Sequence, residues 1–376
     1  MTTESLMAAF PWIALAGLAG AFWSYHRLLL YPSGGAHLQR LASQIHDGAM
    51  VFIRREYRRI AIVLMALATI IAFTPGFGVL ASAALLSGAC CSMFAGWLGI
   101  KAATRGGALT TQAALDDGQG KALQVAFLGG SVMGMAVTAL GFGGLTLILL
   151  MPWTGSDEVC LPIMNAFALG ASCVALFARV GGGIYTKGAD VGADLAGKVE
   201  AGIPEDDARN PGVIADNVGD CVGDTAGMGA DLLESYIGSL VAATAIALGL
   251  ADRQLVILPF VIAAIGIVSS SLGLVLVHKY ARTRPEVAIQ RASLFTGGLF
   301  LLASAFGEWL LLGRLHYIWA IAVGMICGTL IGLVSDYFTS RKPIREIARA
   351  AEQGAGPNVI TGLAVGMRSV VLPVIT

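Results

Sequence analysis

Acidic side chains recur at helical spacing in two short runs near the middle of the chain. Asp190 and Asp194 form the first run, and a longer series follows: Asp216, Asp220, Asp224, Asp231 and Glu234. At about 100° per residue, the second series falls within an arc of about 80° on one continuous helix. Carboxylates stacked in this way repel one another, and the repulsion grows as the local dielectric falls. Such a face needs bound cations, and its hard oxygen ligands favour Mg²⁺ or Ca²⁺.

Basic residues accompany the first acidic run. Arg179, Lys187 and Lys198 share an arc of about 100° with that run if the helix is unbroken. Lysines beside a wall of Mg²⁺-binding carboxylates indicate a phosphate-bearing ligand. Residues 205–207, with the sequence EDD, lie between the two runs. For these three acids, a solvated loop is as good an interpretation as a ligand site.

The composition around these runs is that of a membrane protein. The 376 residues are 56% hydrophobic and 13% charged, with 49 glycines and a mean hydropathy of +0.76. Because about 20 apolar residues cross a bilayer, the sequence predicts about ten membrane spans, at residues 8–30, 57–74, 78–100, 123–151, 162–186, 217–250, 255–277, 293–312, 317–336 and 359–376. We therefore expect an all-α, polytopic transmembrane helix bundle, with one domain over residues 1–376 and the candidate site in the stretch at about 179–234.

The placement of Lys and Arg predicts the orientation in the bilayer. With the N-terminus outside, the cytoplasmic loops and adjoining helix ends hold all but four of the 24 basic residues, and these loops are 26–59, 101–121, 187–216, 278–292 and 337–358. The four exceptions are Arg179, Arg253, Arg314 and Arg368. This asymmetry puts the acidic runs at the cytoplasmic face of a multi-pass protein, which we expect in a bacterial inner membrane. No basic patch interleaved with aromatic residues points to nucleic acid.

One long stretch resembles a known family. It reads GGGIYTKGADVGADLAGKVEAGIPEDDARNPGVIADNVGDCVGDTAGMGADLLESY and is similar to the signature of membrane-bound pyrophosphatases, the pyrophosphate-driven H⁺ or Na⁺ pumps. Two further stretches resemble the same family, IHDGAMVFIRREYRRIAI near the start and GLAVGMRSVVLPVI at the end. The resemblance covers the whole chain, which matches about the first half of such a pump. It implies hydrolysis of pyrophosphate to two phosphates coupled to outward movement of H⁺, with Na⁺ as the alternative ion.

The resemblance also implies roles for individual residues. The implied substrate-binding residues are Lys187, Asp190, Asp194, Lys198 and Asp216, and the implied Mg²⁺ ligands are Asp190, Asp194, Asp216, Asp220 and Asp224. Asp220 and Asp224 would be catalytic, with Asp224 orienting and deprotonating the attacking water. Arg179 and Asp231 would form a gate below this site, or a purely structural salt bridge, and Glu234 would carry the ion. The position of Glu234 three residues after Asp231 resembles Na⁺ pumps and a subset of H⁺ pumps.

The sequence departs from the family pattern at two places. Cys221 stands where the family commonly has Asn, and a thiol is a poor Mg²⁺ ligand. The remaining Asp, Asn and Lys motifs of the family are absent, so we expect activity to need a second half of the pump. The resemblance also implies that the protein lies in the lipid bilayer and forms the family's usual homodimer. A K⁺ requirement stays open, because the residues that govern it belong to that second half. The alternatives are a catalytically incomplete fragment or subunit, and a cation channel or carrier.

Overall fold

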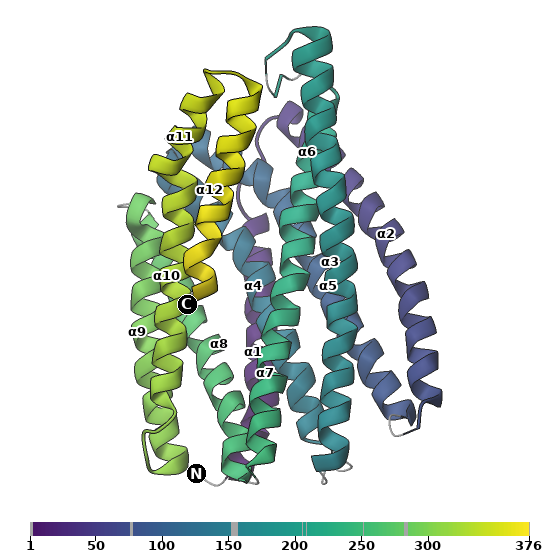
Figure 1. Ribbon diagram of the computed structural model, residues 1–376, viewed down its shortest axis with the longest axis vertical. Helices are drawn as coiled ribbons and strands as arrows, with labels where there is room; N and C mark the ends of the chain where they lie inside the picture. Colours follow the sequence, from purple (N-terminus) through teal and green to yellow (C-terminus); the bar gives the residue numbers. More distant parts are fainter. Residues whose placement is uncertain are drawn as a thin grey trace. The chain divides into compact units, whose positions relative to one another are not determined.

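The computed structural model describes residues 3–75, 78–151, 157–204, 206–207, 209–250, 252–281 and 285–375 (Figure 1). All regular elements within these ranges are helical, which confirms the predicted all-α fold. The chain forms two compact units, Met1–Phe300 and Leu301–Thr376. The first unit contains α1 (Thr3–Leu29), α2 (Ala36–Phe73), α3 (Gly78–Asp117), α4 (Gln119–Leu149), α5 (Asp157–Asp194), α6 (Gly212–Asp220), α7 (Met228–Gly249), α8 (Arg253–Ala281) and the start of α9 (Pro285–Leu312).

The helices confirm an integral membrane protein. Among the described residues, nine helical stretches are long and apolar enough to cross a membrane, and they coincide with nine of the ten predicted spans. The remaining prediction, residues 57–74, falls on the second half of α2. That half is too highly charged to count as a membrane span, because the last 18 residues of α2 include three charged side chains, those of Glu56, Arg58 and Arg59. The apolar part of α2 is therefore short, and its basic part lies within the same continuous helix.

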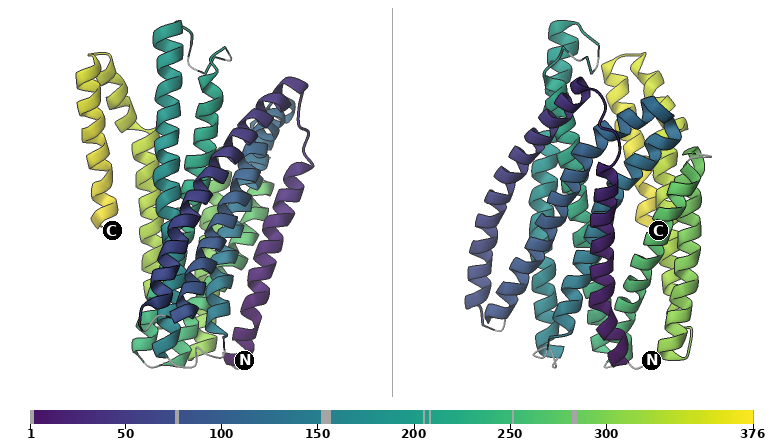
Figure 2. Two further views of the ribbon diagram at one scale, coloured as in Figure 1. Left: turned by 90° about the vertical axis from the view of Figure 1, so that its right-hand side faces the viewer. Right: turned by 180° about the vertical axis from the view of Figure 1, so that it is seen from behind.

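Small residues let the helices of the first unit approach closely. Gly88 on α3 faces α5, and a Cβ atom on it would collide with the backbone carbonyl of Phe167. Gly170 on α5 faces α3, and a Cβ atom on it would collide with the backbone carbonyl of Leu85. Membrane helices use such small residues to bring backbones into contact. The chain then returns along α6 and α7, which lie beside α5 in the views of Figures 1 and 2. The two acidic runs are thus on neighbouring helices.

Two π-helical segments interrupt the acidic stretch. η2 (Leu195–Ala201) extends α5, and η3 (Cys221–Gly227) joins α6 to α7. The prediction of one unbroken α-helix from Asp216 to Glu234 is therefore wrong. A π-helix has more residues per turn than an α-helix, so η3 turns Asp231 and Glu234 away from the angular positions that an uninterrupted helix would give them.

The second unit contains the end of α9, then α10 (Ile318–Ser340), α11 (Lys342–Ala351) and α12 (Ala355–Ile375). Glu308 on α9 is fully buried, and its Oε1 accepts hydrogen bonds of 2.6 Å from the backbone N–H groups of His316 and Tyr317. These N–H groups precede α10, so the carboxylate fixes the turn between the two helices. Arg368 on α12 forms a 2.9 Å salt bridge with Glu346 on α11, which explains a cation within a predicted span.

Candidate functional site

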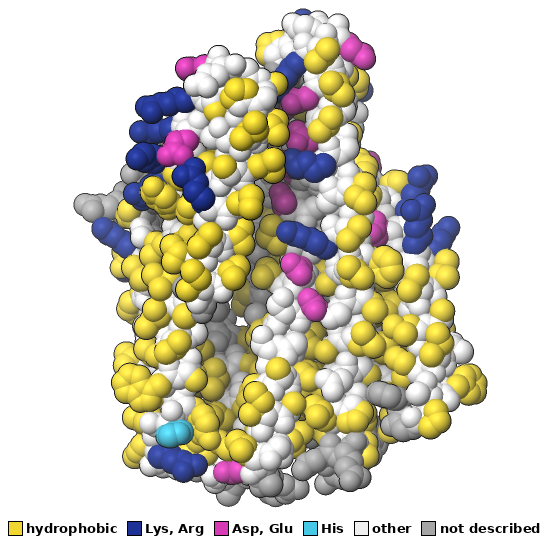
Figure 3. Space-filling model, in the orientation of Figure 1, with side chains coloured by type: hydrophobic (Ala, Val, Ile, Leu, Met, Phe, Trp, Pro, Cys, Tyr) yellow, Lys and Arg dark blue, Asp and Glu magenta, His cyan; other side chains and the backbone are white. Residues whose placement is uncertain are grey.

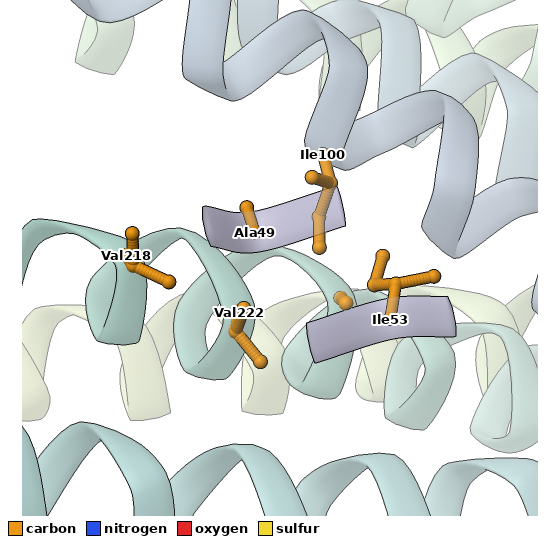
Figure 4. Packing of buried hydrophobic residues seen from close by; sticks show 6 residues of the cluster. Ala49, Ile53, Ile100, Val218 and Val222 are labelled. Carbon is orange, nitrogen blue, oxygen red and sulfur yellow. The ribbon is translucent and has the colours of Figure 1, made fainter. Parts of the chain in front are cut away.

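The sequence VGDCVGDTAG (residues 218–227) repeats with a period of four residues, and each position of the repeat has its own surroundings. The apolar members Val218, Val222 and Ala226 are buried against α2 and α3. Figure 4 shows Val218 and Val222 in one cluster with Ala49 and Ile53 of α2. A mixture of α- and π-helical turns averages close to four residues per turn, which keeps the members of such a repeat in straight columns. The π segment therefore fits the spacing of the sequence.

The glycine column of the same repeat packs against α5. A Cβ atom on Gly219 would lie 2.9 Å from Cα of Thr186, and one on Gly182 would lie 3.3 Å from Cα of Gly223. The Thr186 hydroxyl is 2.7 Å from the carbonyl oxygen of Gly219, so it can donate a hydrogen bond across this contact. Glycine is needed here because the two backbones nearly touch.

The aspartates complete the repeat on the remaining side. Asp220 and Asp224 each follow a buried glycine, and both are exposed. Asp220 lies within electrostatic range of Asp224 on its own helix and of Asp190 on α5. Figure 3 shows acidic and basic side chains following the upper part of the α5–α7 region into a mostly hydrophobic face. The packing of glycine and valine thus leaves the carboxylates of Asp220 and Asp224 on the exposed side of the helix.

A small polar pocket brings the two acidic runs together. Its volume is about 100 Å³, and its polar lining comes from both sides of the helical pair, namely Asp190, Asp194, Lys198, Asp206, Asn210 and Asp216. Four residues predicted for the site, Asp190, Asp194, Lys198 and Asp216, are thus neighbours at this pocket. Lys187 forms a 2.8 Å salt bridge with Asp190, and Lys198 forms one of 2.8 Å with Asp194. Both lysines are exposed, and their ammonium groups neutralise only part of the acidic charge.

The loop between the runs is anchored by a residue that the sequence analysis missed. Asn210 is buried, donates a 2.7 Å hydrogen bond to the carbonyl oxygen of Ala193, and accepts one of 2.9 Å from the backbone N–H of Gly212. Asp206 lines the pocket, whereas the side chain of Asp207 pairs with Arg209 at 2.7 Å. Hydrogen bonds from Arg209 lower the pKa of Asp207 to about 2. Glu205, the third acid of this loop, lies outside the described residues.

The carboxylates suit a divalent cation in chemistry but do not form a closed cage. Within the described ranges, no three His, Cys, Asp or Glu side chains lie close enough together to hold a metal on their own. The predicted set of five aspartate ligands is therefore not gathered around one point. Mg²⁺ is usually held by one or two carboxylates together with water and substrate phosphates. Asp190, Asp194, Asp216 and Asp220 could serve in that manner, since all are oxygen donors at or beside the pocket.

The predicted gate residues lie further along the helices. Arg179 is exposed on α5, and Asp231 is half-buried on α7. In the part of the chain that the structure describes, these two side chains form no salt bridge, so the predicted pair is not made. Glu234 instead accepts a 2.8 Å hydrogen bond from the hydroxyl of Ser172 on α5. Ser172 lies two helical turns before Arg179, a spacing that could have pointed to it.

Comparison with known proteins identifies the family. The family model described as inorganic H⁺ pyrophosphatase matches residues 15–376. The chain belongs to this family. It is 40% identical to the K(+)-insensitive pyrophosphate-energized proton pump of Caldanaerobacter subterraneus subsp. tengcongensis, with 91% of this chain and 53% of that protein covered. It is 36% identical to the pump of the same name from Methanosarcina mazei, with 99% and 55% covered.

A sodium pump is among the relatives as well. A protein of Clostridium tetani with the provisional name K(+)-stimulated pyrophosphate-energized sodium pump is 42% identical, with 91% of this chain and 50% of that protein covered. The chain spans about half the length of the curated relatives it matches. The relatives include both H⁺ and Na⁺ pumps at similar identity, so the family assignment alone leaves the transported ion open.

Proposed function

We propose that this chain forms one wall of a Mg²⁺–pyrophosphate site, in a pump that couples hydrolysis of pyrophosphate to outward movement of H⁺. The observation that supports this most directly is the pairing of α5 with α6 and η3. The glycine contacts hold the two backbones together, so that lysines and aspartates of one helix face aspartates of the other. We place the site at the cytoplasmic face of a bacterial inner membrane, following the distribution of Lys and Arg.

The lysines and aspartates have separate tasks in this proposal. Lys187 and Lys198 exchange their present carboxylate partners for phosphate oxygens when pyrophosphate binds. Asp190, Asp194, Asp216 and Asp220 hold Mg²⁺, which neutralises the charge of the leaving phosphate. Asp224 is exposed next to Asp220, where it can orient a water molecule and accept its proton.

Glu234 is the proposed ion carrier. Placing an ionisable group within a membrane costs free energy, so such a group is generally found where it has a function, such as on an ion path. Within the described residues, Ser172 is the one side chain that lies within hydrogen-bonding distance of the Glu234 carboxylate. A Na⁺ site needs several oxygen ligands, so this sparse environment favours H⁺. Arg179 and Asp231 form the proposed gate when substrate is bound, since both line the interval between the pocket and Glu234.

The wall needs further elements to enclose the substrate. Asp220 and Asp224 are exposed, and phosphoryl transfer depends on positioning in a site that excludes bulk water. We therefore propose that the active assembly adds residues from beyond α5–α7, including those of the family's remaining length, and that it forms a homodimer. Without those residues the chain would be a catalytically silent subunit.

Mg²⁺-dependent pyrophosphate hydrolysis in membranes tests this proposal. Membranes would carry the 376 residues alone, or together with a polypeptide covering the rest of a relative's length. We expect activity in the second case, loss of it in Asp224→Ala, and retention of it in Asp117→Ala, an exposed acid at the end of α3. Activity of Asp224→Ala equal to the unsubstituted assembly would refute the role of that residue. Binding of Mg²⁺ that is independent of pyrophosphate would favour a cation carrier instead.

A further inference from the structure

A second cavity lies at the ends of three helices of the first unit. Its volume is about 410 Å³, and it is enclosed by the end of α1, the start of α4 and the end of α8. It shares no residue with the acidic pocket. Phe127, Leu128, Leu274 and Val277 make its walls apolar. These helix ends adjoin the predicted cytoplasmic loops, so the cavity sits at the level of lipid headgroups.

Two cations line this cavity without a carboxylate partner. Arg27 and Lys121 form no salt bridge within the part of the chain that the structure describes. Each is placed over an aromatic ring instead, Arg27 at 5.2 Å from the centroid of Trp23 and Lys121 at 5.2 Å from that of Tyr31. Aromatic rings hold cations without neutralising them. The mouth of the cavity therefore carries two positive charges and attracts an anion.

A buried amide supplies an independent sign of a ligand. Gln124 lines the cavity and is 1% exposed. Its Nε2 donates a 2.5 Å hydrogen bond to the carbonyl oxygen of His278. Its Oε1 is buried and has no hydrogen-bond partner among the described residues. Because buried polar atoms are almost always paired, this oxygen calls for a donor such as a hydroxyl group.

We propose that the cavity binds an anionic glycerophospholipid of the phosphatidylglycerol type. Arg27 and Lys121 contact its phosphate, and Gln124 Oε1 accepts a hydrogen bond from a headgroup hydroxyl. The acyl chains lie along the apolar walls and leave past Val275, which is exposed at the rim. Trp23 and Tyr31 lie at the interfacial depth where such aromatic residues are enriched. The shape and charge match an amphiphile, because an apolar slot is joined to a cationic mouth.

Native mass spectrometry of the full chain in detergent can test the proposal. The chain would be titrated with phosphatidylglycerol or with phosphatidylcholine of the same acyl length. We expect a retained phosphatidylglycerol adduct, and an apparent affinity lower by about fivefold for each removed charge in Arg27→Gln and Lys121→Gln. Arg54→Gln, which removes an exposed cation of α2 outside the cavity, should keep the affinity of the unsubstituted chain.

Two further measurements make the test decisive. Gln124→Met keeps the volume but removes the acceptor, so it should weaken phosphatidylglycerol binding while leaving phosphatidylcholine binding unchanged. Equal affinity of the unsubstituted chain for the two lipids would overturn the proposal, and it requires no variant. Displacement of the lipid by millimolar inorganic phosphate would also overturn it, since the site would then recognise a free anion. Unchanged phosphatidylglycerol binding in the Arg27→Gln, Lys121→Gln double variant would show that the lipid binds elsewhere, and this result too would overturn the proposal.

Discussion

Ser172 on α5 donates a 2.8 Å hydrogen bond to Oε1 of Glu234 on α7. This contact joins the two helices at the half-buried carboxylate that follows Asp231. It leaves the second oxygen of Glu234 for another partner. The proposed ion carrier is thus held by a residue on α5, the helix that also bears Lys187 and Asp190, two of the proposed substrate-binding residues.

Ser172→Ala should impair ion transport more than hydrolysis in an active assembly. A hydrogen bond to a charged acceptor contributes about 1.5–3 kcal/mol, so its loss should release the Glu234 carboxylate from its present position beside α5. The measurement is H⁺ uptake into vesicles divided by phosphate released. Ser239→Ala is the matched control, because that hydroxyl donates a hydrogen bond to the carbonyl oxygen of Ser235 on its own helix. An unchanged ratio in Ser172→Ala would contradict the role given to this contact.

Gly219→Ala should destabilise the protein by about 1–3 kcal/mol through overpacking. The new methyl group would lie 2.9 Å from Cα of Thr186, and neither backbone can move without separating α5 from α6. Thermal unfolding in detergent measures this effect. Gly183→Ala on α5 is the control, since a Cβ atom there meets nothing within 4 Å. That substitution should be neutral or slightly stabilising because alanine favours helix.

Glu308→Ala should destabilise the second unit by about 1–3 kcal/mol, because it leaves two backbone N–H groups without their acceptor. Those groups, of His316 and Tyr317, are the ones that the carboxylate holds at 2.6 Å. Glu308→Gln keeps an acceptor oxygen in the same place and should retain most of the stability. Limited proteolysis between α9 and α10 provides the measurement. Equal protection of the two variants would show that the carboxylate does not fix this turn.

Acidification should loosen the contact between α2 and α3. Thr104 already donates its hydroxyl hydrogen to Ile100, so its oxygen accepts a 2.8 Å hydrogen bond from His46 Nδ1. Burial, together with the charges of Arg105 and Lys101, lowers the pKa of His46 below its ordinary value of 6.5, against an opposing effect of Asp47. The neutral imidazole is therefore favoured by folding.

The stability from His46 is complete above pH 6.5 and is lost as the pH falls below it, because the unfolded chain binds the proton first. We expect the drop in Tm between pH 7.5 and pH 5.5 to be smaller in His46→Gln, whose amide can still donate to Thr104. An equal drop in both proteins would assign the acid sensitivity to other groups.

The sequence predicted the spans well because hydropathy is a local property, whereas the meeting of the two acidic runs was expected from the family resemblance. Nine predicted spans are confirmed, and Asp190, Asp194 and Asp216 meet at one pocket. The course of the backbone between Asp220 and Met228 was mispredicted, since a fixed 100° step cannot represent a change of hydrogen-bond register. The four-residue repeat of valine, glycine and aspartate was the signal for that change.

The contacts of Ser172, Thr186 and Asn210 were missed for a different reason. Each joins segments 17 to 62 residues apart in the chain. Such hydrogen bonds depend on how neighbouring helices are rotated about their axes, and that rotation is decided by packing rather than by local sequence. Arg179 and Asp231 show that charge alone does not predict such a contact. Their charges are opposite and their helices are adjacent, but the two side chains do not meet in this structure.

The π-helical segment decides where a change of chain length would alter the site. Loss of one residue between Gly223 and Gly227 would allow η3 to close as an α-helix, because the π-helical turns hold about one residue more than the α-helical turns that would replace them. Residues from Met228 onward would then keep nearly their present directions, and Glu234 would stay beside Ser172. Loss of one residue from the regular part of α7 before Glu234 would instead turn Glu234 by about 100° and break this contact. When homologous sequences are aligned, a single-residue gap within η3 is therefore compatible with the same contact between α5 and α7, whereas a gap between Met228 and Glu234 is not.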